Sequence, residues 1–214
     1  MAVAKRRKVG NLLALALLAL LAPGAPMHPY QMVSVLRRTG KEHDMKIKWG
    51  SLYTVVQNLE KHGFIAATDS RREGRRPERT VYAITEAGRA ELTDWLRELV
   101  AEPEPEYPRF KAALSVLGAL HPDEAETLLR RRLSALQTSI ADQRSMLAEA
   151  ADVPRIFLIE GEYAVAMCEA EAAWVRSLVT QLEHGTLPGV AEWRRYHDEG
   201  AIQPEWLRML EEGG

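Results

Sequence analysis

The stretch KIKWGSLYTVVQNLEKHGFI, residues 46–65, decides how the rest of the chain is interpreted. Its aliphatic residues at i, i+3, i+4 and i+7 predict a helix over residues 51–62 with one buried stripe, formed by Leu52, Val55, Val56 and Leu59. The opposite face carries Thr54, Gln57 and Lys61, with Tyr53 and Asn58 beside it. These side chains can donate to phosphates or contact base edges, and none is acidic. The pattern therefore suggests a recognition helix.

Short strands are expected on both sides of this helix. Ile47 and Trp49 alternate with lysines before it, which predicts a strand over residues 46–49, and Gly63 ends the helix. Residues 64–68 and 80–85 are typical of two strands of a hairpin. The segment between these strands contains five arginines: Arg71, Arg72, Arg75, Arg76 and Arg79. It is either a solvated hairpin tip or a wing that lies along DNA phosphates or in the minor groove.

The N-terminal residues allow two interpretations. Basic residues 5–8 precede an apolar run over residues 11–22, which has the layout of a secretory signal but is too short for a transmembrane helix. The alternative is a buried first helix, capped by Asn11 and ended by Pro23 and Gly24. We favour the helix, because the recognition helix needs a further helix to cover its apolar stripe. Residues 5–8 would then form a basic arm able to reach phosphates.

Two more helices complete the expected N-terminal domain. Pro29 suits the first turn of a helix that runs to about residue 38, the first helix of a helix-turn-helix. Thr85 and Glu86 open a later helix with an apolar stripe at Leu92, Trp95, Leu96 and Leu99. Residues 1–100 carry 17 Lys and Arg against 10 Asp and Glu, whereas the remainder carries 11 against 20. A basic half suggests contact with a polyanion, and an acidic half suggests another role.

The second half of the chain is predicted to be helical. A linker rich in proline and glutamate, residues 102–108, is followed by a short stripe that ends at residue 121 and by a helix capped by Asp123. Heptad spacing in that helix, and one face of a further helix over residues 155–184, predict a dimer interface: Leu129, Leu133, Leu136, Ile140, Leu147, Tyr163, Met167, Ala170 and Trp174. A closed bundle within one chain is the alternative.

Catalytic and metal sites find no support in the sequence. The six histidines are scattered without zinc-ligand spacing, Cys168 has no histidine near it in sequence, and no glycine-rich phosphate loop occurs. We therefore expect no enzyme activity, no metal and no cofactor. Tyr163, Met167 and Trp174 share one helical face and could wall a site for a small hydrophobic effector, although the ordinary explanation is that they fill a dimer core.

Four stretches together resemble the PadR family of winged helix-turn-helix transcriptional regulators over about residues 10–100. They are residues 18–30 (LALLAPGAPMHPY), 50–53 (GSLY), 59–65 (LEKHGFI), and 74–76 (GRR) through 81–89 (VYAITEAGR). The resemblance implies a homodimer that binds pseudo-palindromic double-stranded operator DNA and is often released by a small molecule or another signal.

The expected fold is mainly α, with an N-terminal winged helix of three helices and a small antiparallel sheet, followed by a C-terminal dimerisation domain of long helices. The expected boundaries are 1–101 for the DNA-binding domain, 102–108 for the linker and 109–214 for the dimerisation and effector domain. We predict a cytoplasmic repressor without a membrane partner; the alternatives are a winged-helix protein-interaction module and a secreted helical protein. The predicted DNA-binding residues are Ser51, Tyr53, Thr54, Gln57, Asn58, Lys61, Arg71, Arg72, Arg75, Arg76, Arg79, His28 and Tyr30.

Overall fold

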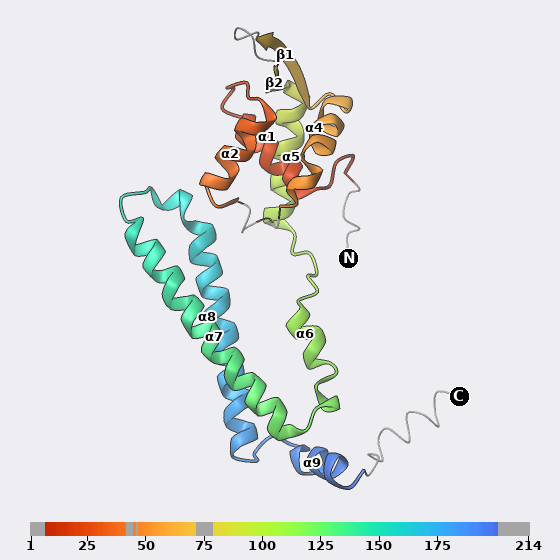
Figure 1. Ribbon diagram of the computed structural model, residues 1–214, viewed down its shortest axis with the longest axis vertical. Coiled ribbons are helices and arrows are strands. Elements are labelled where there is room, and N and C mark those ends of the chain that lie inside the picture. Colours follow the sequence, from red (N-terminus) through yellow and green to blue (C-terminus); the bar gives the residue numbers. More distant parts are fainter. Residues whose placement is uncertain (1–6, 42–44, 46, 72–78, 201–214) are drawn as a thin grey trace, which may run out of the picture. The chain divides into compact units, whose positions relative to one another are not determined.

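The computed structural model describes residues 7–41, 45, 47–71 and 79–200, and it divides the chain into two compact units at about residue 105. In the first unit, helices and a two-stranded hairpin surround one central helix (Figure 1). Its elements are α1 (Leu12–Leu21), α2 (Pro29–Arg38), the 3-10 helix η1 (Trp49–Ser51), α4 (Leu52–Lys61), β1 (Ile65–Arg71), β2 (Arg79–Ile84) and α5 (Glu86–Ala101).

Helix α1 is the centre of the first unit. Seven of its ten residues are buried, and they pack against α2, α4, α5 and β2. As predicted, Asn11 caps the helix, its Oδ1 accepting a hydrogen bond from the Leu13 N–H at 2.9 Å. The last turn of α1 has no basic residue of its own, and Arg89 of α5 donates to the Ala22 carbonyl there. If α1 were cleaved as a signal peptide, the first unit would lose the centre of its core.

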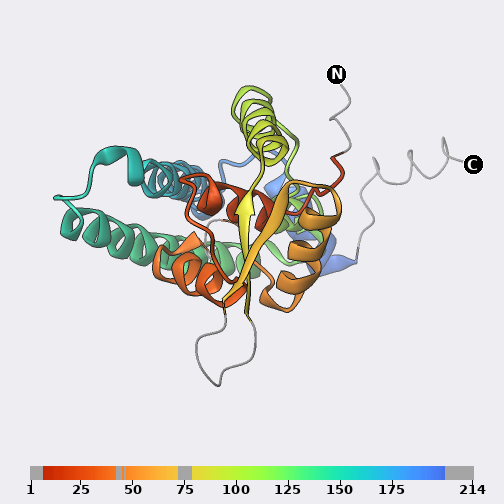
Figure 2. The ribbon, with the colours of Figure 1, turned by 90° about the horizontal axis from the view of Figure 1, so that it is seen from above.

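The wing is a two-stranded antiparallel hairpin, and the strands run side by side (Figure 2). Ile65 pairs with Ile84 and Ala67 with Tyr82, after which the register shifts before Asp69, so Thr68 is the extra residue of a bulge. Met27, in the loop between α1 and α2, pairs with Tyr82 through hydrogen bonds of 2.9 and 3.0 Å. This pairing ties the inner edge of the wing to the helical core.

The predicted strand over residues 46–49 is wrong for the described part of that segment. Residues 47 and 48 lie outside any strand, and Trp49 begins the 3-10 helix that leads into α4. Ile47 and Trp49 both contact the core, and the Arg37 guanidinium lies 4.9 Å from the Trp49 ring centroid. Packing of these apolar side chains, together with the cation–π contact, decides the local structure more strongly than the two-residue alternation.

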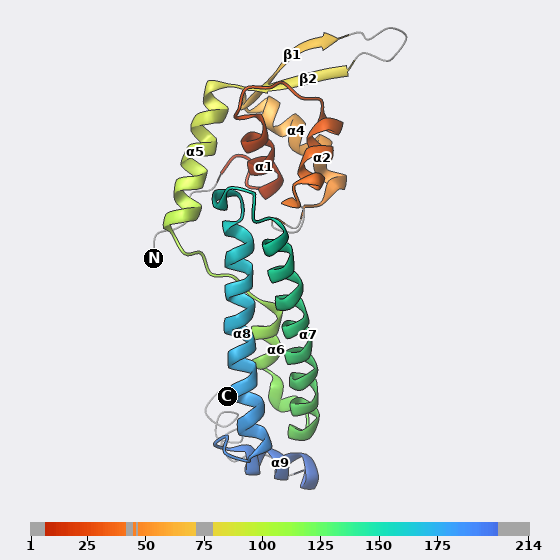
Figure 3. The same cartoon turned by 90° about the vertical axis from the view of Figure 1, so that its left-hand side faces the viewer.

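The second unit is a long helical hairpin with shorter helices attached. Its elements are α6 (Arg109–Leu114), the 3-10 helix η2 (Leu117–Ala119), α7 (Pro122–Glu149), the 3-10 helix η3 (Arg155–Phe157), α8 (Ile159–Glu183) and α9 (Val190–Glu199). Helix α8 returns alongside α7 for most of its length (Figure 3). Leu129, Val175 and Val179 are buried between them, and Gly161 lets the Leu147 side chain approach to 3.1 Å from where a Cβ would lie.

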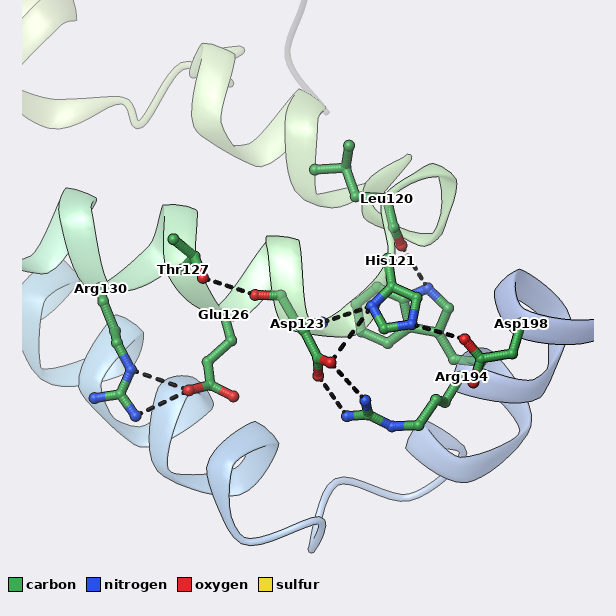
Figure 4. Close-up of polar contacts among 9 residues, drawn as sticks. Leu120, His121, Asp123, Glu126, Thr127, Arg130, Arg194 and Asp198 are labelled. Atoms are coloured by element: carbon green, nitrogen blue, oxygen red, sulfur yellow. Dashed lines mark hydrogen bonds and ion pairs between the residues drawn. The ribbon is translucent and has the colours of Figure 1, made fainter.

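A polar cluster attaches α9 to the start of α7 (Figure 4). Arg194 binds Asp123 at 2.6–2.8 Å, His121 lies 3.3 Å from Asp198, and the Trp193 indole donates to the Leu120 carbonyl at 2.9 Å. The hydrogen bond from Arg194 holds the pKa of Asp123 below its usual range. The predicted cap of α7 is corrected here: His121, not Asp123, is the capping residue, because its Nδ1 accepts from the Asp123 N–H and Pro122 occupies the first turn.

Gly88 is the position where α5 makes its closest approach to the loop after α4. Thr85 caps α5 by accepting from the Gly88 N–H, while its own hydroxyl donates to the Gly63 carbonyl at 2.6 Å. A Cβ built on Gly88 would lie 2.0 Å from the Phe64 carbonyl oxygen, a backbone atom that cannot move aside cheaply. Only glycine therefore fits at this crossing.

We predict that Gly88→Ala lowers the free energy of unfolding by on the order of 2–3 kcal/mol, because the new methyl group forces α5 away from the loop after α4. Urea titration followed by circular dichroism measures the effect. Gly10→Ala is the matched control, since nothing lies within 4 Å of a Cβ at that position. Equal stabilities of the two variants would contradict the assigned close contact.

Candidate nucleic-acid interface

The outer face of α4 carries the side chains predicted to contact DNA. Leu52, Val55, Val56 and Leu59 are all buried, so the expected stripe faces the core. Opposite to it, five side chains are exposed: Tyr53, Thr54, Gln57, Asn58 and Lys61. Ser51 is half-buried, and its hydroxyl donates to the Lys48 carbonyl at 2.8 Å. The exposed face therefore offers hydroxyl, amide and ammonium groups to a partner.

Aromatic side chains extend this face from α4 toward the start of α2. Tyr30 and Tyr53 are exposed and lie edge to face, with ring centroids 6.2 Å apart. The hydrogen bond between the Tyr53 and Tyr30 hydroxyls raises the pKa of Tyr53, because it stabilises the protonated phenol. His28 stacks on Tyr30 at 5.4 Å and caps α2, where its Nδ1 accepts from the Tyr30 N–H. His28 thus positions the start of α2 in addition to bordering the face.

The predicted wing arginines are only partly covered by the structure. Arg72, Arg75 and Arg76 lie outside the described residues. Arg71 and Arg79 pair with each other in β1 and β2, which places their backbone at the outer end of the described hairpin. The α4 face and the hairpin therefore belong to the same unit. The contacts of the wing arginines with DNA stay a prediction.

The basic arm predicted for residues 5–8 is corrected at Arg7. Its side chain is only 4% exposed and binds carboxylates of α5, Glu91 at 2.9 Å and Asp94 at 3.4 Å, as well as Glu98. The guanidinium also lies 5.3 Å from the Trp95 ring centroid. Burial alone would lower the pKa of Arg7, but the hydrogen bonds and charges of Glu91 and Glu98 outweigh it and raise that pKa. Arg7 is therefore used within the fold and cannot reach phosphates.

Sequence reasoning missed this cluster, and also two cations on α2. Arg37 and Arg38 are exposed in the last turn of α2, where they complement the helix dipole, and Arg37 also covers Trp49. The spacing of Glu91, Asp94 and Glu98 at i, i+3 and i+7 places three acids on one face of α5. This spacing indicates that a cation of the same chain could bind to the acidic face of α5. It does not identify which Lys or Arg that cation is.

The predicted dimer-interface residues divide into two sets. Leu129, Leu133 and Leu136 pack in the core between α7 and α8 of the same chain. Three residues of α8 are instead exposed: Tyr163 at 67%, Met167 at 48% and Trp174 at 50%. Trp174 is covered on one side by Phe110 of α6, with centroids 6.2 Å apart. The three leucines of α7 are thus covered by α8 of the same chain. The exposed residues of α8 are left for contact with another molecule.

Within the described ranges, no helix is both long and apolar enough to cross a membrane. Nor do three His, Cys, Asp or Glu side chains among the described residues converge on a common point where a metal ion could bind. Cys168 is half-buried, and the Gln143 side chain lies 3.9 Å from its sulfur.

The fold is that of a winged helix followed by long helices, and comparison with known proteins agrees. Residues 17–94 match the model of the transcriptional regulator PadR-like family, which confirms the resemblance found in the sequence. This is a family of transcriptional regulators and not of enzymes. No curated protein matches the chain.

Solved structures with a similar fold include PadR of Bacillus subtilis in complex with operator DNA and in complex with p-coumaric acid. Each is 21% identical with a TM-score of 0.65, and each match covers 80% of this chain and 99% of the other. The Vibrio cholerae virulence activator AphA is 15% identical with a TM-score of 0.60, covering 80% of this chain and 98% of its own. At these identities the similarity establishes the fold.

We predict that Arg7→Ala lowers the free energy of unfolding by about 3 kcal/mol, because three neighbouring carboxylates lose their shared cation. Arg7→Lys should lie between wild type and Arg7→Ala, since it keeps the charge but loses the planar fork. Urea unfolding followed by tryptophan fluorescence measures both. Lys8→Ala serves as control because Lys8 is exposed, and a loss of stability in that variant equal to that of Arg7→Ala would rule out a specific role for Arg7.

Proposed function

We propose that the chain is a DNA-binding transcriptional regulator that inserts α4 into the major groove of double-stranded operator DNA. The carrying observation is the exposed polar face of α4, with Thr54, Gln57 and Lys61 opposite a fully buried stripe. Glu60 is the only acid on this helix, and its hydrogen bond with Tyr82 points it to the wing. An almost acid-free face suits the phosphate-lined groove.

Other predicted residues have supporting roles in this proposal. Tyr53 and Tyr30 bind phosphates, His28 holds the start of α2, and Asn58 borders the groove. Ser51 binds a phosphate only if its hydroxyl turns away from the Lys48 carbonyl. The five wing arginines contribute affinity that does not depend on sequence, because they contact the backbone or the minor groove. A winged helix that binds only protein would not need this concentration of cations, which makes DNA the better partner.

The regulator acts as a homodimer in this proposal, since two recognition helices are needed for a pseudo-palindromic operator. Support comes from α8, whose exposed Tyr163, Met167 and Trp174 lie on one apolar face with Ala170. Ile140 and Leu147 remain only half-buried by α8 in the single chain, so a partner can complete their burial. The proposed domain boundaries are those expected from the sequence, with residues 102–108 as the linker.

We further propose a cytoplasmic repressor that is released by a small molecule. The Bacillus subtilis neighbour was solved with both operator DNA and p-coumaric acid, which supports a ligand-responsive regulator of this fold. The Vibrio cholerae neighbour is an activator, and activation is therefore the second candidate. An effector must bind the DNA-free form more tightly, because equal affinity for both forms changes nothing. Tyr163, Met167 and Trp174 are one candidate wall for a planar hydrophobic effector.

The function is tested by selecting DNA fragments from the source genome with the purified chain and measuring affinity for the enriched site. Gln57→Ala should weaken specific binding by about 1–3 kcal/mol if the amide contacts a base, whereas Lys61→Ala should weaken all DNA equally if it contacts phosphate. Leu128→Ala, a change of an exposed residue in the second unit, is the control. Failure to enrich any site, or unchanged affinity in both α4 variants, would refute the proposal.

Dimerisation is tested with Met167→Glu in the full chain. Met167 is half exposed in the single chain, so the substitution should leave the fold intact but place charges at the subunit contact. Analytical ultracentrifugation should show a monomer, with operator affinity reduced because two half-sites are no longer engaged together. Leu128→Glu on α7 has similar exposure and should remain dimeric. A Met167→Glu protein that stays dimeric would exclude this face.

A further inference from the structure

A groove lies between α7 and α8, and of the residues proposed for the dimer interface it includes only Ile140. Its volume is about 350 Å³, within the size range of small-molecule sites. Its lining comes from both helices: Gln137, Ile140, Ala141, Arg144, Glu169, Ala172 and Arg176. Ala141 and Ala172 create the hollow, because short side chains here stand between long ones on either side. Ala172 is 3% exposed and forms part of an apolar floor with Ile140.

The charges of the groove are unequal at its two ends. Arg144 binds Glu169 at 2.6 Å, so that end is neutralised. Arg176 is exposed, and its side chain makes no hydrogen bond or ion pair with any other residue in the described part of the chain. Gln137 lines the same groove with an amide that can donate. The groove thus has a small apolar floor between polar walls and a net charge of one cation.

Apart from Ile140, this groove is separate from the residues proposed for dimerisation, and it does not include their α8 members. At 100° per residue, Glu169 and Arg176 lie on one side of the buried line formed by Ala172 and Val175, while Met167 and Trp174 lie on the other side. Occupation of the groove therefore does not require the Trp174 face. The site also differs in chemistry, since the Trp174 face carries aromatic and apolar groups without a free cation.

We propose that the groove binds a medium-chain aliphatic carboxylate. The carboxylate accepts hydrogen bonds from the Arg176 guanidinium and the Gln137 amide, and the alkyl chain lies over Ile140, Ala141 and Ala172 toward the Arg144–Glu169 pair. The seven steps from Gln137 to Arg144 advance by about 10 Å along α7, so the groove is elongated and suits an extended chain. One spare cation matches a monoanion, whereas a dianionic head group would leave a charge unpaired.

The probes are hexanoate, octanoate and 1-octanol, titrated into the full-length protein by isothermal calorimetry below their aggregation concentrations. Octanoate should bind up to about 15-fold more tightly than hexanoate, since each buried methylene contributes about fourfold at most. 1-Octanol should bind about tenfold more weakly than octanoate because it lacks the charge that pairs with Arg176. Equal affinities for all three probes would overturn the proposal.

Two variants place the binding in the groove. Arg176→Gln should weaken octanoate about tenfold by removing the cation, and Ala141→Leu should abolish binding by filling the hollow from its exposed rim. Leucine is a good helix former, so Ala141→Leu keeps α7 intact. Arg131→Gln is the matched control, because Arg131 is an exposed arginine of α7 outside the lining. Octanoate binding that survives both groove variants would assign it elsewhere.

Ultracentrifugation of the same variants identifies a competing occupant. If Arg176→Gln or Ala141→Leu converts a dimer to a monomer, the groove is covered by a second copy and the proposal is wrong. A role of the groove as the effector site rests on the proposed regulatory function, but binding itself does not. Octanoate binding without any enriched operator would refute the function alone, and operator binding without octanoate binding would refute the groove alone.

Discussion

The burial of α1 on all sides is the constraint on which the first unit depends. Each fully buried leucine in such a core contributes about 1.5–3 kcal/mol, and four leucines of α1 are at most 1% exposed: Leu13, Leu17, Leu18 and Leu21. Because α2, α4, α5 and β2 all pack on this helix, it sets where α4 and the wing lie. The polar face of α4 is outward because its other face is held by α1.

Three polar contacts hold the same unit together at its edges. The Arg7 cluster fastens the chain before α1 to α5, and Arg89 of α5 in turn caps the end of α1. The Met27–Tyr82 pairing fastens the wing to the loop between α1 and α2. These contacts join segments that are distant in sequence, so the orientation of the wing relative to α4 is a property of the whole unit.

Helix α8 of the second unit has three different surfaces. One side of α8 packs on α7, the Tyr163 to Trp174 face remains exposed, and the groove with Arg176 opens on the remaining side. A hairpin of two helices cannot bury more than part of each surface, which explains why so many apolar residues of α8 stay exposed. Those surfaces are where a partner subunit and a ligand can bind without disturbing the fold.

The winged helix could be predicted well because its signals are local. The period of Leu52 to Leu59, the Asn11 cap, Pro29 in its first turn and Thr85 before α5 all specify structure within a few residues. The exposed residues of the candidate site on α4 follow from the same periodicity. The family resemblance added what periodicity does not contain, namely the expectation of a homodimer on pseudo-palindromic operator DNA.

Other features were decided only by the tertiary structure. The basic run at residues 5–8 has the same sequence signal whether it faces phosphates or protein, and only the position of α5 directs Arg7 to three carboxylates. His121 is the cap in place of Asp123, because α7 begins at Pro122, before the position expected from the sequence. The heptad seam likewise fixes which side of α7 is apolar, but not whether α8 of the same chain or another subunit covers it. Sequence determines periodic faces because backbone geometry repeats, whereas the partner of each face depends on contacts between segments far apart along the chain.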